Sequence, residues 1–133
     1  MKRELSVCLS TSMIQSFDLT NKVVAVVDVF RATSVICTAL SNGMSEVIPV
    51  NEISDVKSFL NKENILIAAE RGGKIVEGFK FGNSPLSYVD NPKIIGKKLV
   101  LTTTNGTKAI NSSLKADDIL IGSFLNLSSL ENL

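Results

Sequence analysis

The chain holds 133 residues, with 14 Lys and Arg against 13 Asp and Glu and no histidine, which leaves a formal net charge of +1 at pH 7. That length fits one domain spanning residues 1–133, and a composition of 44% hydrophobic and 20% charged residues excludes a disordered or collagen-like chain. A near-neutral charge argues against binding nucleic acid or an anionic membrane through excess Lys and Arg, and it favours small-molecule partners.

Several kinds of site are excluded by the residues that the chain lacks. Without histidine there is no imidazole general base and no histidine-ligated zinc, so catalysis would depend on carboxylates, Arg, Lys or a hard metal ion. Two cysteines without CxxC spacing cannot form a disulfide framework, which indicates a reducing compartment, the cytoplasm. No apolar stretch approaches the ~20 residues of a membrane span, and the first residues do not resemble a signal peptide.

Short apolar runs alternate with helical patterns along the chain. Strands are predicted at residues 5–9, 23–27, 46–50, 65–69, 98–102 and 119–122. Helices are predicted at 32–41, 53–60 and 84–89, after residues 103–107 to about residue 112, and from residue 123 onward. The run at 23–27, Val-Val-Ala-Val-Val, is typical of a strand buried on both faces. This alternation predicts an α/β fold, with three α/β/α layers and a mostly parallel central sheet.

Polar residues follow several of these strands, at the sheet edge where α/β proteins bind ligands. Asp28 follows the apolar run directly, and a carboxylate there suits a Mg²⁺ ligand or a nucleophile. The alternatives are that Asp28 caps the next helix or pairs with Arg31. Glu70, Arg71, Gly72 and Gly73 follow the strand predicted at residues 65–69. They can hold a metal ion and an anion, or they form an ordinary solvated turn.

Two further segments add polar groups to the same edge. Hydroxyl-rich residues 102–107 enter a predicted helix N-terminus, where backbone N–H groups favour an anion such as phosphate, although an ordinary helix cap would have the same sequence. Asn83 and Ser84 follow the glycine-rich loop of residues 70–82. Ser84 before Pro85 is equally explained as a helix cap.

Taken in order, five motifs resemble those of the 2-phosphosulfolactate phosphatase family. They are VVDVFRATS (26–34), AERGG (69–73), GFKFGNSPL (78–86), LTTTNGT (101–107) and IGSFLN (121–126). The resemblance implies an α/β fold and a Mg²⁺-dependent phosphatase that converts (R)-2-phospho-3-sulfolactate to sulfolactate, a step of coenzyme M biosynthesis. Family members are longer, so we expect this chain to correspond to the N-terminal part of a family-length protein.

The resemblance places the polar residues described above at the family's motif positions. By their chemistry, Asp28 and Glu70 are the predicted Mg²⁺ ligands, and Asp28, Arg31 and Glu70 are the predicted catalytic residues. The predicted substrate-binding residues are Arg31, Arg71, Gly72, Asn83, Ser84, Thr103, Thr104, Asn105 and Gly106.

The expected partner is a small anionic organophosphate, with neither nucleic acid nor membrane, and a second copy could fill an exposed sheet edge to give a homodimer. Attack by water and a covalent phospho-Asp28 intermediate are both open. The alternative functions are a non-catalytic phosphate-binding α/β module and an inactive fragment of such a phosphatase.

Overall fold

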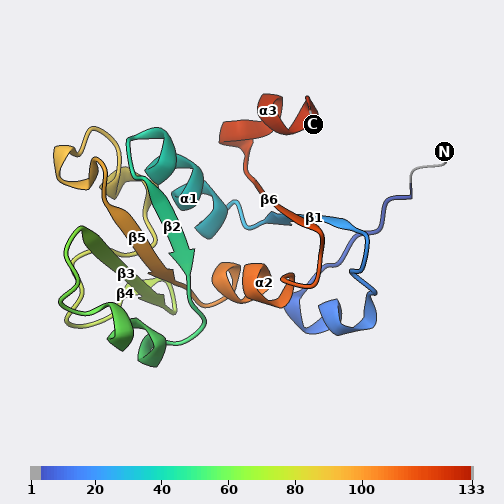
Figure 1. The fold of residues 1–133 in the computed structure, drawn as a ribbon, viewed down its shortest axis with the longest axis horizontal. Helices are drawn as coiled ribbons and strands as arrows, with labels where there is room; N and C mark the ends of the chain where they lie inside the picture. The colour runs from blue at the N-terminus through green and yellow to red at the C-terminus, as the bar shows by residue number, and fades with distance from the viewer. Residues whose placement is uncertain (1–3, 133) are drawn as a thin grey trace.

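The computed structural model describes residues 4–132. Within that range the strands form two sheets, one of two strands in the order β1-β6 and one of four in the order β2-β5-β3-β4 (Figure 1). The strands are β1 (Val23–Val27), β2 (Glu46–Pro49), β3 (Ile65–Arg71), β4 (Lys74–Ile75), β5 (Lys98–Thr102) and β6 (Asp118–Gly122). Only the β3–β4 pair is antiparallel among these described strands, so the predicted α/β class with mostly parallel strands is confirmed.

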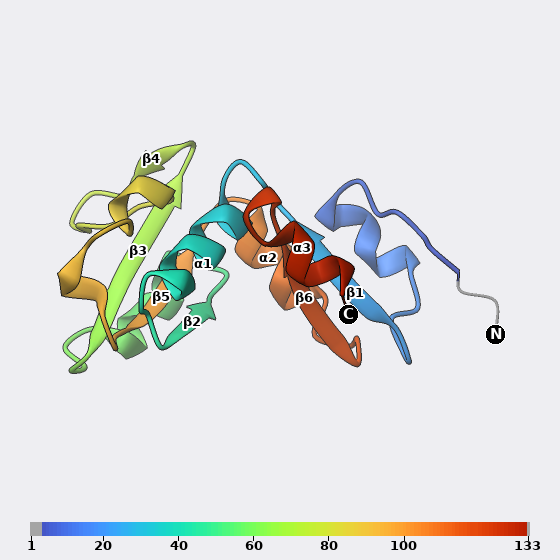
Figure 2. The same cartoon turned by 90° about the horizontal axis from the view of Figure 1, so that it is seen from above.

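Two helices lie between the two sheets (Figure 2). Helix α1 (Ala32–Ser41) contacts β6 and β2, and α2 (Gly106–Ser112) contacts β1 and β2. Because α1 is covered from two sides, seven of its ten residues are buried. The expected central sheet is thus divided into two sheets that share these helices. The predicted stop of α1 is confirmed, since Gly43 has a φ of +101°, which glycine adopts without strain.

The remaining helical segments are short. They are the 3₁₀ helices η1 (Thr11–Ser16), η2 (Ile53–Phe59), η3 (Pro85–Ser87), η4 (Pro92–Ile94) and η5 (Phe124–Asn126), and the α-helix α3 (Leu127–Glu131). The helices predicted at 53–60 and 84–89 are therefore present as single 3₁₀ segments, and only Val56 of η2 is fully buried. No helix within residues 4–132 is long and apolar enough to cross a membrane.

Two predictions for the N-terminal part are wrong. Residues 5–9 form no strand and are exposed. Strand β1 is not buried on both faces, since Val23 is 61% and Val27 63% exposed and only Val26 is buried. The reason is that β1 pairs with a single strand, β6, so most of its surface lacks a neighbour within the described residues.

The core lies between α1 and the four-stranded sheet, around Val35, Leu99 and Leu101. Tyr88 is fully buried there, and its hydroxyl donates a hydrogen bond of 3.0 Å to the carbonyl oxygen of Gly82. This bond fixes the segment that leads into Asn83. Burial also raises the pKa of the Tyr88 hydroxyl. The buried Tyr88 therefore anchors the loop before Asn83, which reaches the carboxyl ends of the strands.

Candidate functional site

The carboxyl ends of β1, β3 and β5 meet at one pocket of about 300 Å³. Ala69 of β3 pairs with Thr102 of β5, so the residues that follow these two positions lie side by side. The pocket is lined by Asp28, Phe30, Arg31, Glu70, Gly72, Gly73, Asn83, Thr103, Thr104 and Asn105. Eight of these were predicted as site residues from the sequence, and they come from four separate segments of the chain.

Asp28 is fixed by its own backbone. Its N–H donates to the Thr33 hydroxyl oxygen, and the Thr33 N–H donates to the Asp28 carbonyl oxygen, both at 3.0 Å. Burial raises the pKa of the Asp28 carboxyl, and the charge of Glu70 raises it further, against the opposing effects of the Ala32 backbone and Arg31. No ion pair within 4.0 Å involves Asp28 among the described residues, so it is not the partner of Arg31.

Glu70 has the opposite environment, because three hydrogen bonds converge on its carboxylate. The Gly73 N–H and the Thr104 hydroxyl donate to Oε1 at 2.6 and 3.0 Å, and the Thr104 N–H donates to Oε2 at 3.3 Å. Burial raises the pKa of Glu70, but these bonds and the charge of Arg31 outweigh that effect and hold it below its ordinary value. Glu70 is therefore held as an anion at neutral pH.

Arg31 and Asn83 bring a cation and an amide to the same pocket. The Arg31 Nη2 donates to the Gly73 carbonyl oxygen at 3.0 Å, which joins the start of α1 to the β3–β4 turn. Asn83 is only 6% exposed, and its Oδ1 has no hydrogen-bond partner within residues 4–132. Because an unpaired buried amide oxygen is costly, this residue is suited to a ligand that offers a hydrogen-bond donor or a positive charge.

Three predicted site residues do not line the pocket. The Arg71 guanidinium donates to the carbonyl oxygens of Glu70 and Asn51 and to the Thr102 hydroxyl, at 2.7 to 3.0 Å, so it ties β3 to its neighbours. Ser84 precedes η3 without a side-chain capping bond. Gly106 instead allows a close approach, since a Cβ atom there would collide with Ala32 and lie 2.7 Å from Oδ2 of Asp28.

The structure also qualifies the predicted phosphate-binding turn at residues 103–107. The Thr103 N–H donates to the Thr107 hydroxyl and the Thr104 N–H donates to Glu70, so these two amides are already bonded. Thr103 and Thr107 are both buried and hydrogen-bond to each other, which is a structural role.

Sequence reasoning missed one lining residue, Phe30, and placed Gly73 at the strand end without counting it as a substrate-binding residue. Phe30 is apolar and 91% exposed, unlike the polar residues sought at strand ends. Its position between Asp28 and Arg31 is the signal that could have identified it.

A family model and two relatives that match this chain carry the same description. Residues 8–132 match the family model described as 2-phosphosulpholactate phosphatase. The chain is 44% identical over 131 residues to a protein of Clostridium novyi, covering 97% of this chain and 55% of the relative. It is 51% identical over 105 residues to a protein of Thermotoga maritima, covering 79% of this chain and 45% of the relative. Both are named "probable 2-phosphosulfolactate phosphatase", and the chain spans about half their length.

Proposed function

The chain belongs to the 2-phosphosulfolactate phosphatase family, and on that basis we propose that it carries the substrate pocket of a Mg²⁺-dependent phosphatase. The proposed reaction converts (R)-2-phospho-3-sulfolactate and water to sulfolactate and phosphate, as in coenzyme M biosynthesis, in the cytoplasm. The substrate is a small anionic organophosphate, in line with the names of the relatives.

The observation that carries the proposal is the placement of Asp28 and Glu70 in one pocket with a single cationic side chain, Arg31. Two carboxylates against one guanidinium leave the pocket negative, and a phosphorylated sulfonate would be repelled from it. A bound divalent cation reverses that balance.

The oxygen groups present suit Mg²⁺. This ion prefers hard oxygen ligands, needs only one or two carboxylates, and completes its shell with waters and substrate phosphate. Asp28 and Glu70 would supply the carboxylates. The unpaired Oδ1 of Asn83 is a further oxygen in the lining, and it suits a metal-bound water or a direct ligand. Within residues 4–132, no group of three or more Asp, Glu, Cys or His side chains is arranged to hold a metal ion.

Each residue then has a distinct task. When bound, Mg²⁺ would neutralise phosphoryl oxygens and orient the attacking group. Arg31 would bind phosphate, carboxylate or sulfonate oxygens through its planar fork. Glu70 stays ionised because its three hydrogen bonds favour the anion. Asp28 has no protein cation within 4.0 Å among the described residues, and its carboxylate would hold Mg²⁺ or attack phosphorus. The two candidate nucleophiles are water and the Asp28 carboxylate, which would form phospho-Asp28.

The test is phosphate release from (R)-2-phospho-3-sulfolactate with Mg²⁺ and with EDTA. Mg²⁺-dependent release that falls by about 10²-fold or more in Asp28→Asn supports the proposal. Glu77→Gln, which changes an exposed carboxylate that follows β4 and does not line the pocket, is the matched control and should keep full activity. Release that is unchanged by EDTA or by Asp28→Asn contradicts the proposal. Binding of phosphate ligands without turnover would favour the non-catalytic module. An acid-quenched sample carrying a covalent phosphate, absent from the Asn variant, would identify phospho-Asp28.

A further inference from the structure

Four large apolar side chains stand exposed around the carboxyl ends of β1 and β6. They are Val27, Phe30, Phe124 and Leu125, which are between 63% and 91% exposed, and we call them the apolar rim. Val27 is the last residue of β1 and pairs with Gly122, the last residue of β6. The segments that follow the two strands therefore begin side by side. Isolated apolar residues on a surface are ordinary, but a group of large ones at one place marks a contact surface.

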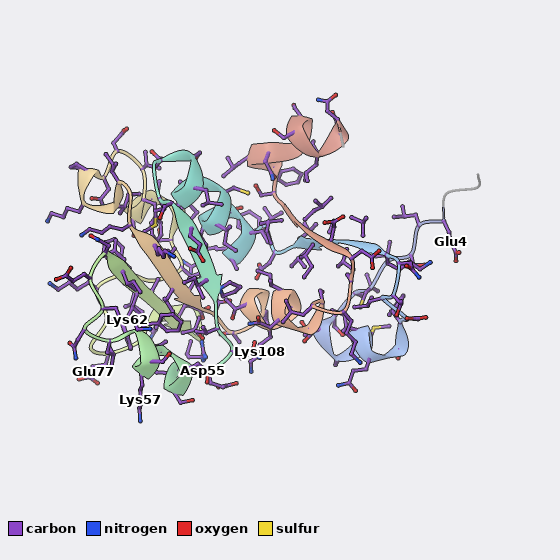
Figure 3. The ribbon with its side chains drawn as sticks, viewed as in Figure 1. Glu4, Asp55, Lys57, Lys62, Glu77 and Lys108 are labelled. Atoms are coloured by element: carbon purple, nitrogen blue, oxygen red, sulfur yellow. The ribbon has the colours of Figure 1, made fainter. Side chains whose placement is uncertain are left out.

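The sheet beneath the apolar rim is also incomplete. Within residues 4–132, β1 pairs only with β6, so each strand has an unpaired edge. A two-stranded sheet is marginal in water, and exposed edges pair readily with further strands. Figure 3 places Lys57, Lys62 and Glu77 beside the four-stranded sheet, on the side remote from β1 and β6. Near the two strands, Asp118 begins β6, and Asp28 and Arg31 flank Phe30 in the sequence. The carboxyl ends of β1 and β6 therefore combine exposed apolar side chains with strand edges that are unpaired within residues 4–132.

We propose that the apolar rim and the β1–β6 edges are the docking surface for a polypeptide equivalent to the half of the relatives that this chain does not match. The relatives from Clostridium novyi and Thermotoga maritima match this chain over only 55% and 45% of their lengths. In each, a segment of similar size lies outside the match. The β1–β6 sheet offers it unpaired strands and uncovered apolar area together.

Docking there also closes the pocket. Phe30 belongs both to the apolar rim and to the pocket lining, so a polypeptide on the rim forms the adjoining pocket wall. That consequence rests on the proposed function, whereas the docking itself does not. A second copy of this chain is the competing occupant, but a linked segment has the advantage of a high effective concentration.

The experiment compares thiol reactivity in two proteins. One is this chain, and the other is a chimera in which this chain replaces the matched half of the Clostridium novyi relative. Both carry Cys8→Ser and Cys37→Ser, because Cys8 is exposed and Cys37 half-buried. Single cysteines are then placed by Leu125→Cys and, as a control, by Ile95→Cys. The two native side chains are equally exposed at 66%, and Ile95 follows η4 beside the four-stranded sheet.

We expect the Leu125→Cys thiol to react at least about tenfold more slowly in the chimera than in the isolated chain. The Ile95→Cys thiol should react equally in both proteins. Equal rates at Leu125→Cys overturn the proposal. So does concentration-dependent protection of that thiol in the isolated chain, which would identify a second copy as the occupant.

Co-production with the unmatched half as a separate polypeptide gives a second readout that needs no folded chimera. A one-to-one complex that Phe124→Glu abolishes supports the proposal, and the absence of a complex with the unsubstituted chain contradicts it. Neither readout depends on phosphatase activity, so this proposal and the proposed function can fail separately.

Discussion

Glu70→Gln offers the sharpest test of how the pocket is held together. The carboxylate accepts three hydrogen bonds, from Gly73 N–H and from the hydroxyl and N–H of Thr104. A glutamine presents one acceptor oxygen, so one donor loses its partner and faces an NH₂ group. The two bonds that remain lose their charge assistance. Bonds to a charged group contribute about 1.5–3 kcal/mol each and neutral ones roughly half, so we expect a loss of about 3 kcal/mol at pH 7.

The pH dependence of that loss identifies its cause. The folded-state pKa of Glu70 lies below its ordinary value, so the stability it contributes is complete above about pH 4.5 and is lost as pH falls through the lower, folded value. Urea unfolding from pH 7 down to pH 3 should therefore show the difference between wild type and Glu70→Gln shrinking in the acid range. Glu77→Gln should stay within about 0.5 kcal/mol of wild type throughout. A Glu70→Gln difference below 0.5 kcal/mol at pH 7, or one unchanged at pH 3, would refute this reasoning.

Two further substitutions test the other side of the pocket. Burial and the charge of Glu70 raise the folded-state pKa of Asp28, so its carboxylate destabilises the fold at neutral pH, and Asp28→Asn should raise Tm by a few degrees without metal. Mg²⁺ at 100 times its Kd should stabilise wild type by about 2.7 kcal/mol but not Asp28→Asn, and equal stabilisation of both proteins would exclude Asp28 as a ligand. Gly106→Ala places a methyl group against Ala32 and Asp28, and calorimetry should report a loss of about 1–3 kcal/mol; an unchanged Tm would show that α2 can move away.

Much of the candidate site follows from a simple rule of parallel sheets. The apolar runs locate β1, β3 and β5, and the residues after them must meet at one edge. Asp28, Glu70 and Thr104 were identified in this way, and the pocket contains all three. Their proposed catalytic and metal-binding roles stay predictions.

The alternation of side chains along a strand could have shown that Glu70 and Arg71 do not enter the same pocket. Successive side chains of a strand point to opposite faces, so adjacent residues in β3 cannot both enter one pocket. Glu70 lines it, and the Arg71 guanidinium instead bonds to Asn51 and Thr102. By contrast, the division into two sheets could not have been predicted. The apolar run at residues 23–27 has the same composition whether its neighbours belong to this chain or to another polypeptide.

The two carboxylates of the pocket differ in how firmly the chain holds them. Glu70 lies on β3, inside a four-stranded sheet, and its side chain is bonded to two neighbouring segments. Asp28 follows β1, in a sheet of only two strands, beside the exposed Phe30. On the proposed function both must hold one ion, which requires their separation to be constant. The position of Asp28 therefore depends on how well β1 is supported. A polypeptide docked on the apolar rim would stabilise β1, and it would act on catalysis through the placement of Asp28 as well as by closing the pocket.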